Sequence, residues 1–118
     1  MKIKLLTITC AALLITGCAN TVKPMYEYEN YSESFYAMKR ESGAETEAEW
    51  LQSLELIIVK SEAKSVRVPP GVYANLGYLN LRSNNNEKAI SYFELEKETY
   101  PESVLFMDRL INRVKTQS

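Results

Sequence analysis

Side chains able to carry catalytic or metal chemistry are few in this chain of 118 residues. It has no histidine, so it lacks the commonest general base, the commonest metal ligand and every histidine-dependent triad. Glu94, Glu96 and Glu98 crowd one segment and could do acid–base work or hold a cation. Lys97 interrupts them and no glycine-containing calcium loop accompanies them, so a solvated helix face is the better interpretation. We expect no catalytic residue, no metal and no small-molecule substrate.

The charge pattern argues against a nucleic-acid partner. The formal net charge is -1, whereas nucleic-acid binding needs a clustered basic surface. Lys60, Lys64 and Arg67 form one small basic cluster. Such a cluster could approach anionic lipid or a cell-wall polymer, but three charges are also ordinary protein surface.

The chemistry that the sequence does indicate is attachment of lipid to Cys18. Lys2 and Lys4 give residues 1–17 a positive start, and an apolar run follows over residues 5–15. That run is too short to cross a membrane, which takes ~20 residues, but it suits a signal peptide. It ends in the tetrapeptide ITGC, which resembles the lipobox of bacterial lipoproteins.

We therefore expect residues 1–17 to be a signal peptide that is removed, leaving Cys18 as the first, lipidated residue. The alternative is a plain secretory signal that happens to contain a cysteine. Ala19 follows Cys18, whereas aspartate at that position usually signals retention at the inner membrane in lipoproteins of this type. The sequence predicts a lipid anchor in the outer membrane, with the protein facing the periplasm. The covalent lipid is the only expected cofactor.

An aromatic segment leads from the anchor into the predicted domain. Residues 18–30 are predicted to be a lipidated tether and aromatic arm, and residues 31–118 a helical domain. The aromatic residues here are Tyr26, Tyr28, Tyr31, Phe35 and Tyr36. They either pack the arm onto the domain or form a partner-binding patch, because tyrosine is enriched at binding hot spots.

Apolar spacing predicts an all-α domain. Helices are expected over about residues 32–39, 47–64, 71–82, 86–99 and 103–115. Thr46 and Glu49 form a capping-box pattern before the second helix, and Gly43 is a natural end for the first. The second helix has one face of Trp50, Leu54, Ile57 and Ser61. The last has an apolar stripe of Val104, Met107, Ile111 and Val114.

Residues 70–102 indicate the architecture. Six positions match the spacing of a tetratricopeptide repeat, a 34-residue helix-turn-helix: Tyr73, Leu76, Gly77, Ala89, Phe93 and Pro101. Gly77 and Ala89 are small where two antiparallel helices would cross closely, and Leu76 and Phe93 would fill the space between them. A generic helical hairpin that matches by chance is the alternative.

Two positions depart from the repeat pattern. Asn80 stands where tyrosine is usual, and Glu96 stands where a small residue is usual. A glutamate there would oppose tight docking of the next helix, or would face solvent because the array ends. One repeat cannot bury its own faces, so the flanking helices must stack on it.

Such a short array leaves an open concave or edge surface, which usually binds a peptide or another protein. The residues expected to contact a partner are exposed ones around Tyr73, Asn80 and Glu96, together with Tyr26, Tyr28, Tyr31 and Tyr36 in the arm. No further site is expected.

The order of these features resembles a known family. Behind the lipobox and the tyrosine-rich arm come the stretches VPPG, ANLG, AISYFELEK, YPES and FMD. Together they resemble a family of small tetratricopeptide-like bacterial lipoproteins of unknown function. Members are typically encoded beside two other lipoproteins, one of which looks like the curli secretion channel.

The resemblance implies an accessory role in an outer-membrane assembly or secretion complex, with a curli-channel-like lipoprotein as one possible partner. It supplies no catalytic residues. A pilotin-like carrier that escorts a pore subunit to the outer membrane is the first alternative. A peptidoglycan-binding protein is the second.

Overall fold

The computed structural model describes residues 22–117. The predicted signal peptide and Cys18 lie outside the described residues. The described part is all-helical, and no strand occurs within it. Its elements are α2 (Tyr31–Arg40), α3 (Ala44–Ala63), α4 (Val72–Arg82), α5 (Asn86–Thr99), the 3₁₀ turn η2 (Pro101–Ser103) and α6 (Val104–Gln117). Each predicted helix is present, with ends within a few residues of the expected ones.

The largest boundary error lies at the start of α3. The helix begins at Ala44, so Thr46 is inside its first turn instead of before it. The Thr46 hydroxyl accepts a hydrogen bond from the Gly43 N–H at 3.1 Å and donates one to the Glu41 carbonyl at 2.6 Å. The expected Thr46–Glu49 capping box is therefore wrong. Gly43, expected to end the preceding helix, is instead the N-cap of α3.

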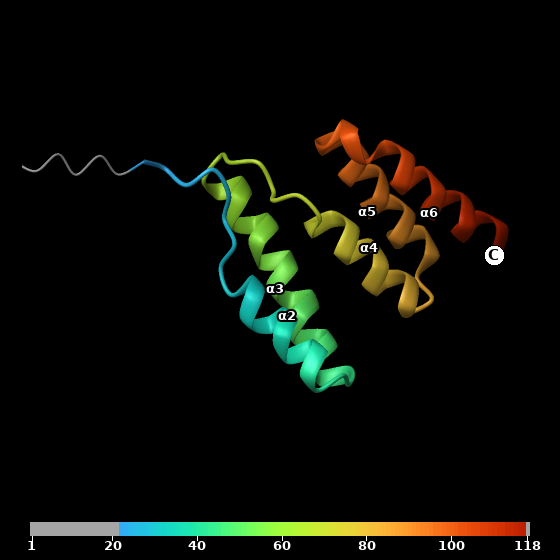
Figure 1. Cartoon of the computed structure of the whole chain (residues 1–118), viewed down its shortest axis with the longest axis horizontal. Coiled ribbons are helices and arrows are strands. Elements are labelled where there is room, and N and C mark those ends of the chain that lie inside the picture. The colour runs from blue at the N-terminus through green and yellow to red at the C-terminus, as the bar shows by residue number, and fades with distance from the viewer. Residues whose placement is uncertain (1–21, 118) are drawn as a thin grey trace, which may run out of the picture.

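Consecutive helices are neighbours in space, as Figure 1 shows for the pair α2–α3 and the group α4–α5–α6. Their apolar faces form two clusters. The first joins α3 to α4 through seven buried residues: Trp50, Leu54, Ile57, Val68, Val72, Leu76 and Leu79. The second joins α5 to α6 through Ala89, Phe93, Met107, Ile111 and Val114. The predicted faces of α3 and α6 are thus confirmed as core, except that Val104 is only half-buried.

Helices α4 and α5 cross closely at Gly77, as the spacing predicts. A Cβ built on Gly77 would lie 2.4 Å from Cε1 of Phe93 and 2.6 Å from its Cδ1. Phe93 is fully buried, so its ring has little room to withdraw. The close packing of the hairpin therefore requires glycine, which has no Cβ, at position 77.

Asn80 and Glu96 are buried, which corrects the expectation that they are exposed. Their exposed fractions are 7% and 4%. The Asn80 side-chain amide donates to the Leu76 carbonyl at 2.8 Å, and its backbone carbonyl accepts from the Ser83 and Asn85 N–H groups. The side chain is thus occupied within its own helix while the backbone closes the α4–α5 turn.

Glu96 caps the start of a neighbouring helix. Its carboxylate accepts the Gly71 N–H at 2.8 Å and the Ala74 N–H at 3.3 Å. These donors belong to the first turn of α4, where N–H groups lack partners within the helix and a negative charge is favoured. Glu96 therefore neither faces solvent nor opposes helix docking, because it supplies from α5 the cap that α4 lacks in its own sequence.

We expect Glu96 to make stability depend on pH. Burial raises the pKa of this carboxyl above its ordinary value, and the two N–H bonds oppose that rise only in part. The folded state then binds the proton more tightly than the unfolded state, so stability falls as pH rises through the window above the ordinary pKa. The unfolding free energy should therefore fall less in Glu96→Gln than in the natural protein between about pH 5 and about pH 7.5. Urea denaturation at both pH values measures this, and equal changes would contradict it.

Candidate functional site

Aromatic residues of α2 pack onto α3, and the arm joins them through a chain of ring contacts. The ring centroid of Tyr31 lies 4.8 Å from that of Trp50, and Phe35 lies 5.4 Å from the same indole. Tyr28 in turn contacts Tyr31 edge-on at 5.9 Å. The Tyr31 hydroxyl accepts a hydrogen bond from the Asn75 side-chain amide at 3.3 Å. Burial raises the pKa of the Tyr31 hydroxyl. The arm tyrosines were expected either to pack onto the domain or to form a partner-binding patch, and Tyr31 packs onto the domain.

Ion pairs tie the same arm to the end of α3. Lys60 Nζ lies 2.6 Å from a carboxylate oxygen of Glu29, and Lys64 pairs with Glu27. The hydrogen bond from Lys64 lowers the pKa of Glu27. Lys23 Nζ donates to the Lys64 carbonyl at 2.6 Å. Two members of the basic cluster thus hold the arm in place, and the arm has a defined path along the domain.

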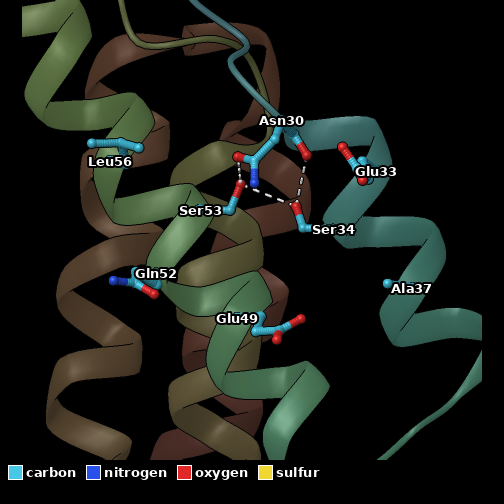
Figure 2. Close-up of a pocket in the computed structure, with 8 residues that line it drawn as sticks. All are labelled: Asn30, Glu33, Ser34, Ala37, Glu49, Gln52, Ser53 and Leu56. Carbon is cyan, nitrogen blue, oxygen red and sulfur yellow. Dashed lines mark hydrogen bonds between the residues drawn. The ribbon is translucent and has the colours of Figure 1, made fainter.

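A groove lies beside this arm, between α2 and α3 (Figure 2). Its volume is about 350 Å³. Eight residues line it: Asn30, Glu33, Ser34, Ala37, Glu49, Gln52, Ser53 and Leu56. Small side chains at Ser34, Ala37 and Ser53 leave the space between the two helices open.

Hydrogen bonds fix the groove where the arm enters α2. The hydroxyl of Ser34 lies 3.0 Å from that of Ser53, and Ser53 donates to the Asn30 side-chain oxygen at 2.9 Å. The single hydrogen of the Ser34 hydroxyl is shared between the Ser53 hydroxyl and the Asn30 carbonyl, which lies 2.9 Å away. Asn30 is the last residue of the arm, so the same network that positions the arm also shapes the groove (Figure 2).

The lining of the groove offers hydroxyl, acidic and apolar side chains to a bound segment. Both serine hydroxyls are engaged by Asn30 and by each other, and the chain has no histidine that could activate either of them. Glu33 and Glu49 contribute acidic side chains from opposite helices, while Leu56 adds an exposed apolar one. A segment with a basic residue and an apolar residue would match this lining.

The residues predicted to contact a partner separate into two groups. Tyr28 and Tyr36 are exposed, Tyr36 by 62%, and remain available on the surface. Tyr26, Tyr31 and Tyr73 are half-buried, and the Tyr73 ring stacks on Tyr92 with centroids 6.4 Å apart. With Asn80 and Glu96 buried, the structure does not bring the predicted set together as one surface.

Sequence reasoning missed the groove. Its residues come from two helices and from Asn30, and none of them forms a recognisable motif. One sequence feature could have indicated it. Ser34 and Ala37 are small residues on the face of α2 that lies opposite Glu49 and Gln52 of α3.

Comparison with known proteins gives one match. A family model described as a domain of unknown function (DUF4810) matches residues 25–110. No curated protein and no solved structure matches the chain. Within residues 22–117, no helix is long and apolar enough to cross a membrane, and no group of three or more acidic, histidine or cysteine side chains is placed to hold a metal ion.

Proposed function

Since the chain belongs to the DUF4810 family, whose function is unknown, we propose a function from its own residues. It is a lipid-anchored, periplasm-facing accessory protein with a tetratricopeptide-like fold. It binds a protein partner in an outer-membrane assembly or secretion complex and has no enzymatic activity of its own.

The stacking of helices supports the tetratricopeptide-like part of this proposal. The hairpin α4–α5 crosses closely at Gly77 and Phe93, the pair α2–α3 packs before it, and α6 packs after it. Arrays of this kind bind peptides and proteins on the surfaces that stacking leaves uncovered. The observation that carries the proposal is the open groove between α2 and α3, with exposed Leu56 in its lining.

The proposed lipid anchor is inferred from the lipobox, and it would determine where the helical domain lies relative to the membrane. Cys18 precedes Val22, the first described residue, by four positions. Because the arm is tied to α3, a lipid on Cys18 would hold the helical domain close to the membrane surface. Acyl chains are buried at ~0.8 kcal/mol per methylene, and more than one chain makes the anchoring stable.

In-cell photo-crosslinking tests the proposal at the groove. A photoreactive phenylalanine analogue replaces Gln52 in a C-terminally tagged chain, and a matched control carries it at Glu87, which is exposed on α5. We expect one discrete outer-membrane adduct from position 52 and none from position 87. Adducts of equal pattern and strength from both positions would contradict a groove-directed partner.

Tyr36→Ala should weaken capture of that partner several-fold without unfolding the domain, because the ring is exposed and makes only an edge contact with Phe35 at 5.7 Å. The matched control is Tyr78→Ala, which removes a similarly exposed tyrosine from α4. Tyr31→Ala is unsuitable, since it would also remove packing against Trp50. Equal recovery from the Tyr36 variant and the natural protein would exclude Tyr36 from the interface.

Fractionation of cells that lack the protein distinguishes an accessory role from that of a carrier. We expect the crosslinked partner to stay in the outer membrane while its assembly works poorly. A partner that leaves the outer membrane would instead indicate the pilotin-like role. Retention of the purified protein on peptidoglycan, with no protein adduct, would favour cell-wall binding.

A further inference from the structure

We propose that the end of the domain nearest the predicted lipid anchor is itself a phospholipid-binding surface, which takes a headgroup phosphate between Lys23 and Arg67. This inference rests on the proposed lipid anchoring. We call the surface the anchor tip and define it as residues 22–26 of the arm and residues 65–67 of the loop that joins α3 to α4.

The anchor tip contains a shallow hollow with a fixed frame. Residues 23–26 and 65–67 line an open space of about 480 Å³. Figure 1 shows these two segments side by side at the end of the molecule where α3 ends. Lys23 is held by its bond to the Lys64 carbonyl, and the loop is held by the buried Tyr100 hydroxyl, which donates to the Val68 carbonyl at 2.6 Å.

Charge at the anchor tip favours an anionic ligand. The nearby arm carboxylates, Glu27 and Glu29, are already paired with Lys64 and Lys60. Within residues 22–117, by contrast, no ion pair joins Lys23 or Arg67 to a carboxylate. The Arg67 guanidinium lies 5.5 Å from the centre of the Tyr100 ring, which leaves its N–H groups able to donate to a phosphate. Two cations therefore flank the hollow without an acidic side chain to compete for them.

Exposed apolar residues adjoin the same hollow. Met25 is 75% exposed and Val22 is 86% exposed. Single exposed apolar residues are common, but Met25 lines the cationic hollow and Val22 precedes Lys23 in the chain. Apolar side chains next to cations suit the boundary between headgroups and acyl chains. The remaining arm aromatic at this end, Tyr26, is half-buried and lines the hollow.

Chain length identifies the ligand as the membrane that would carry the anchor. Val22 comes four positions after Cys18, and an extended chain spans at most ~3.6 Å per position, so the separation is at most ~14 Å. The charges at the anchor tip then lie within about a Debye length or two of the headgroups. A free phosphate ion would explain the two cations but not the exposed Met25 and Val22.

Depth-dependent quenching tests the proposal on the processed, lipidated protein in vesicles of phosphatidylethanolamine and phosphatidylglycerol. In the processed protein Cys10 is removed with the signal peptide and the Cys18 sulfur carries lipid, so Met25→Cys supplies the only free thiol for an environment-sensitive fluorophore. Ser83→Cys, in the α4–α5 turn away from the anchor tip, is the matched control. We expect spin labels on the lipid headgroups to quench the fluorophore at position 25 several-fold more than at position 83. Equal quenching at both positions would overturn the proposal.

A charge-matched pair of variants tests the phosphate contact. Lys23→Gln with Arg67→Gln should lower quenching at position 25 about twofold, whereas Arg109→Gln with Arg113→Gln on α6 removes the same charge and should leave it unchanged. If both pairs of variants lowered quenching equally, the effect would come from net charge alone, and a specific phosphate contact at Lys23 and Arg67 would be contradicted. If no variant associates with vesicles, the lipid anchor and the anchor tip both fail. If all associate and quenching is uniform, the anchor tip alone fails.

Discussion

Trp50→Ala is expected to lower the free energy of unfolding by about 3–5 kcal/mol, the usual cost of removing a large buried aromatic side chain. Trp50 is fully buried, and its indole is the surface on which Tyr31 and Phe35 pack. The alanine variant therefore loses both core volume and the contact that holds α2 and the arm. Because Trp50 is the only tryptophan, urea denaturation must be followed by far-UV circular dichroism.

Trp50→Phe is the matched control for this prediction. A phenyl ring still meets Tyr31 and Phe35, so we expect a clearly smaller loss of stability. Hydrogen exchange should then show that alanine speeds exchange in α2 more than in α5 and α6, whose core cluster contains no residue of α2 or α3. A loss below about 1 kcal/mol, or uniform exchange across all helices, would show that the arm is held mainly by its ion pairs.

Gly77→Ala is the second large effect, with an expected loss of about 1–3 kcal/mol from overpacking. In an exposed helix the same change would stabilise by about 1 kcal/mol, because alanine favours helix more than glycine. The sign reverses here because the new methyl group would lie 2.4 Å from the buried Phe93 ring. Urea denaturation of the purified variant measures the change in unfolding free energy.

Two further variants separate packing from other causes. In a Phe93→Leu background the ring is absent, so adding alanine at Gly77 should cost at least about 1 kcal/mol less than in the natural protein. At Gly43, where an added Cβ meets nothing within 4 Å, alanine should cost at most about 1 kcal/mol, which is the N-cap preference for glycine, and the same amount in both backgrounds. Equal losses at Gly77 in both backgrounds would show that Phe93 is not the obstacle.

The arm connects the two proposed activities of the molecule. One end of it forms part of the anchor tip, and the other ends at Asn30, whose carbonyl and side chain hold Ser34 and Ser53 in the groove. Between them, Glu27 and Glu29 fix the arm to α3. Contact with the membrane at the anchor tip would therefore set the direction in which the groove faces.

Sequence patterns were sufficient for features that depend on residues close together in the chain. The helical period predicted every described helix, the buried face of Trp50, Leu54 and Ile57, and the end of α5 before Pro101. The repeat spacing also predicted the close crossing at Gly77, because a 34-residue unit fixes which residues of its two helices meet. The anchor at Cys18 likewise follows from local sequence and stays a prediction.

Only the tertiary structure decided the features that join distant segments. Glu96 is an ordinary exposed glutamate by local criteria, yet it is buried because α4 begins with N–H groups that its own sequence leaves uncapped. Tyr31 is half-buried because its ring packs against Trp50, whereas Tyr36 on the same helix stays exposed. The groove and the anchor tip have the same origin, since each is lined by segments whose distance in space the helical period does not determine.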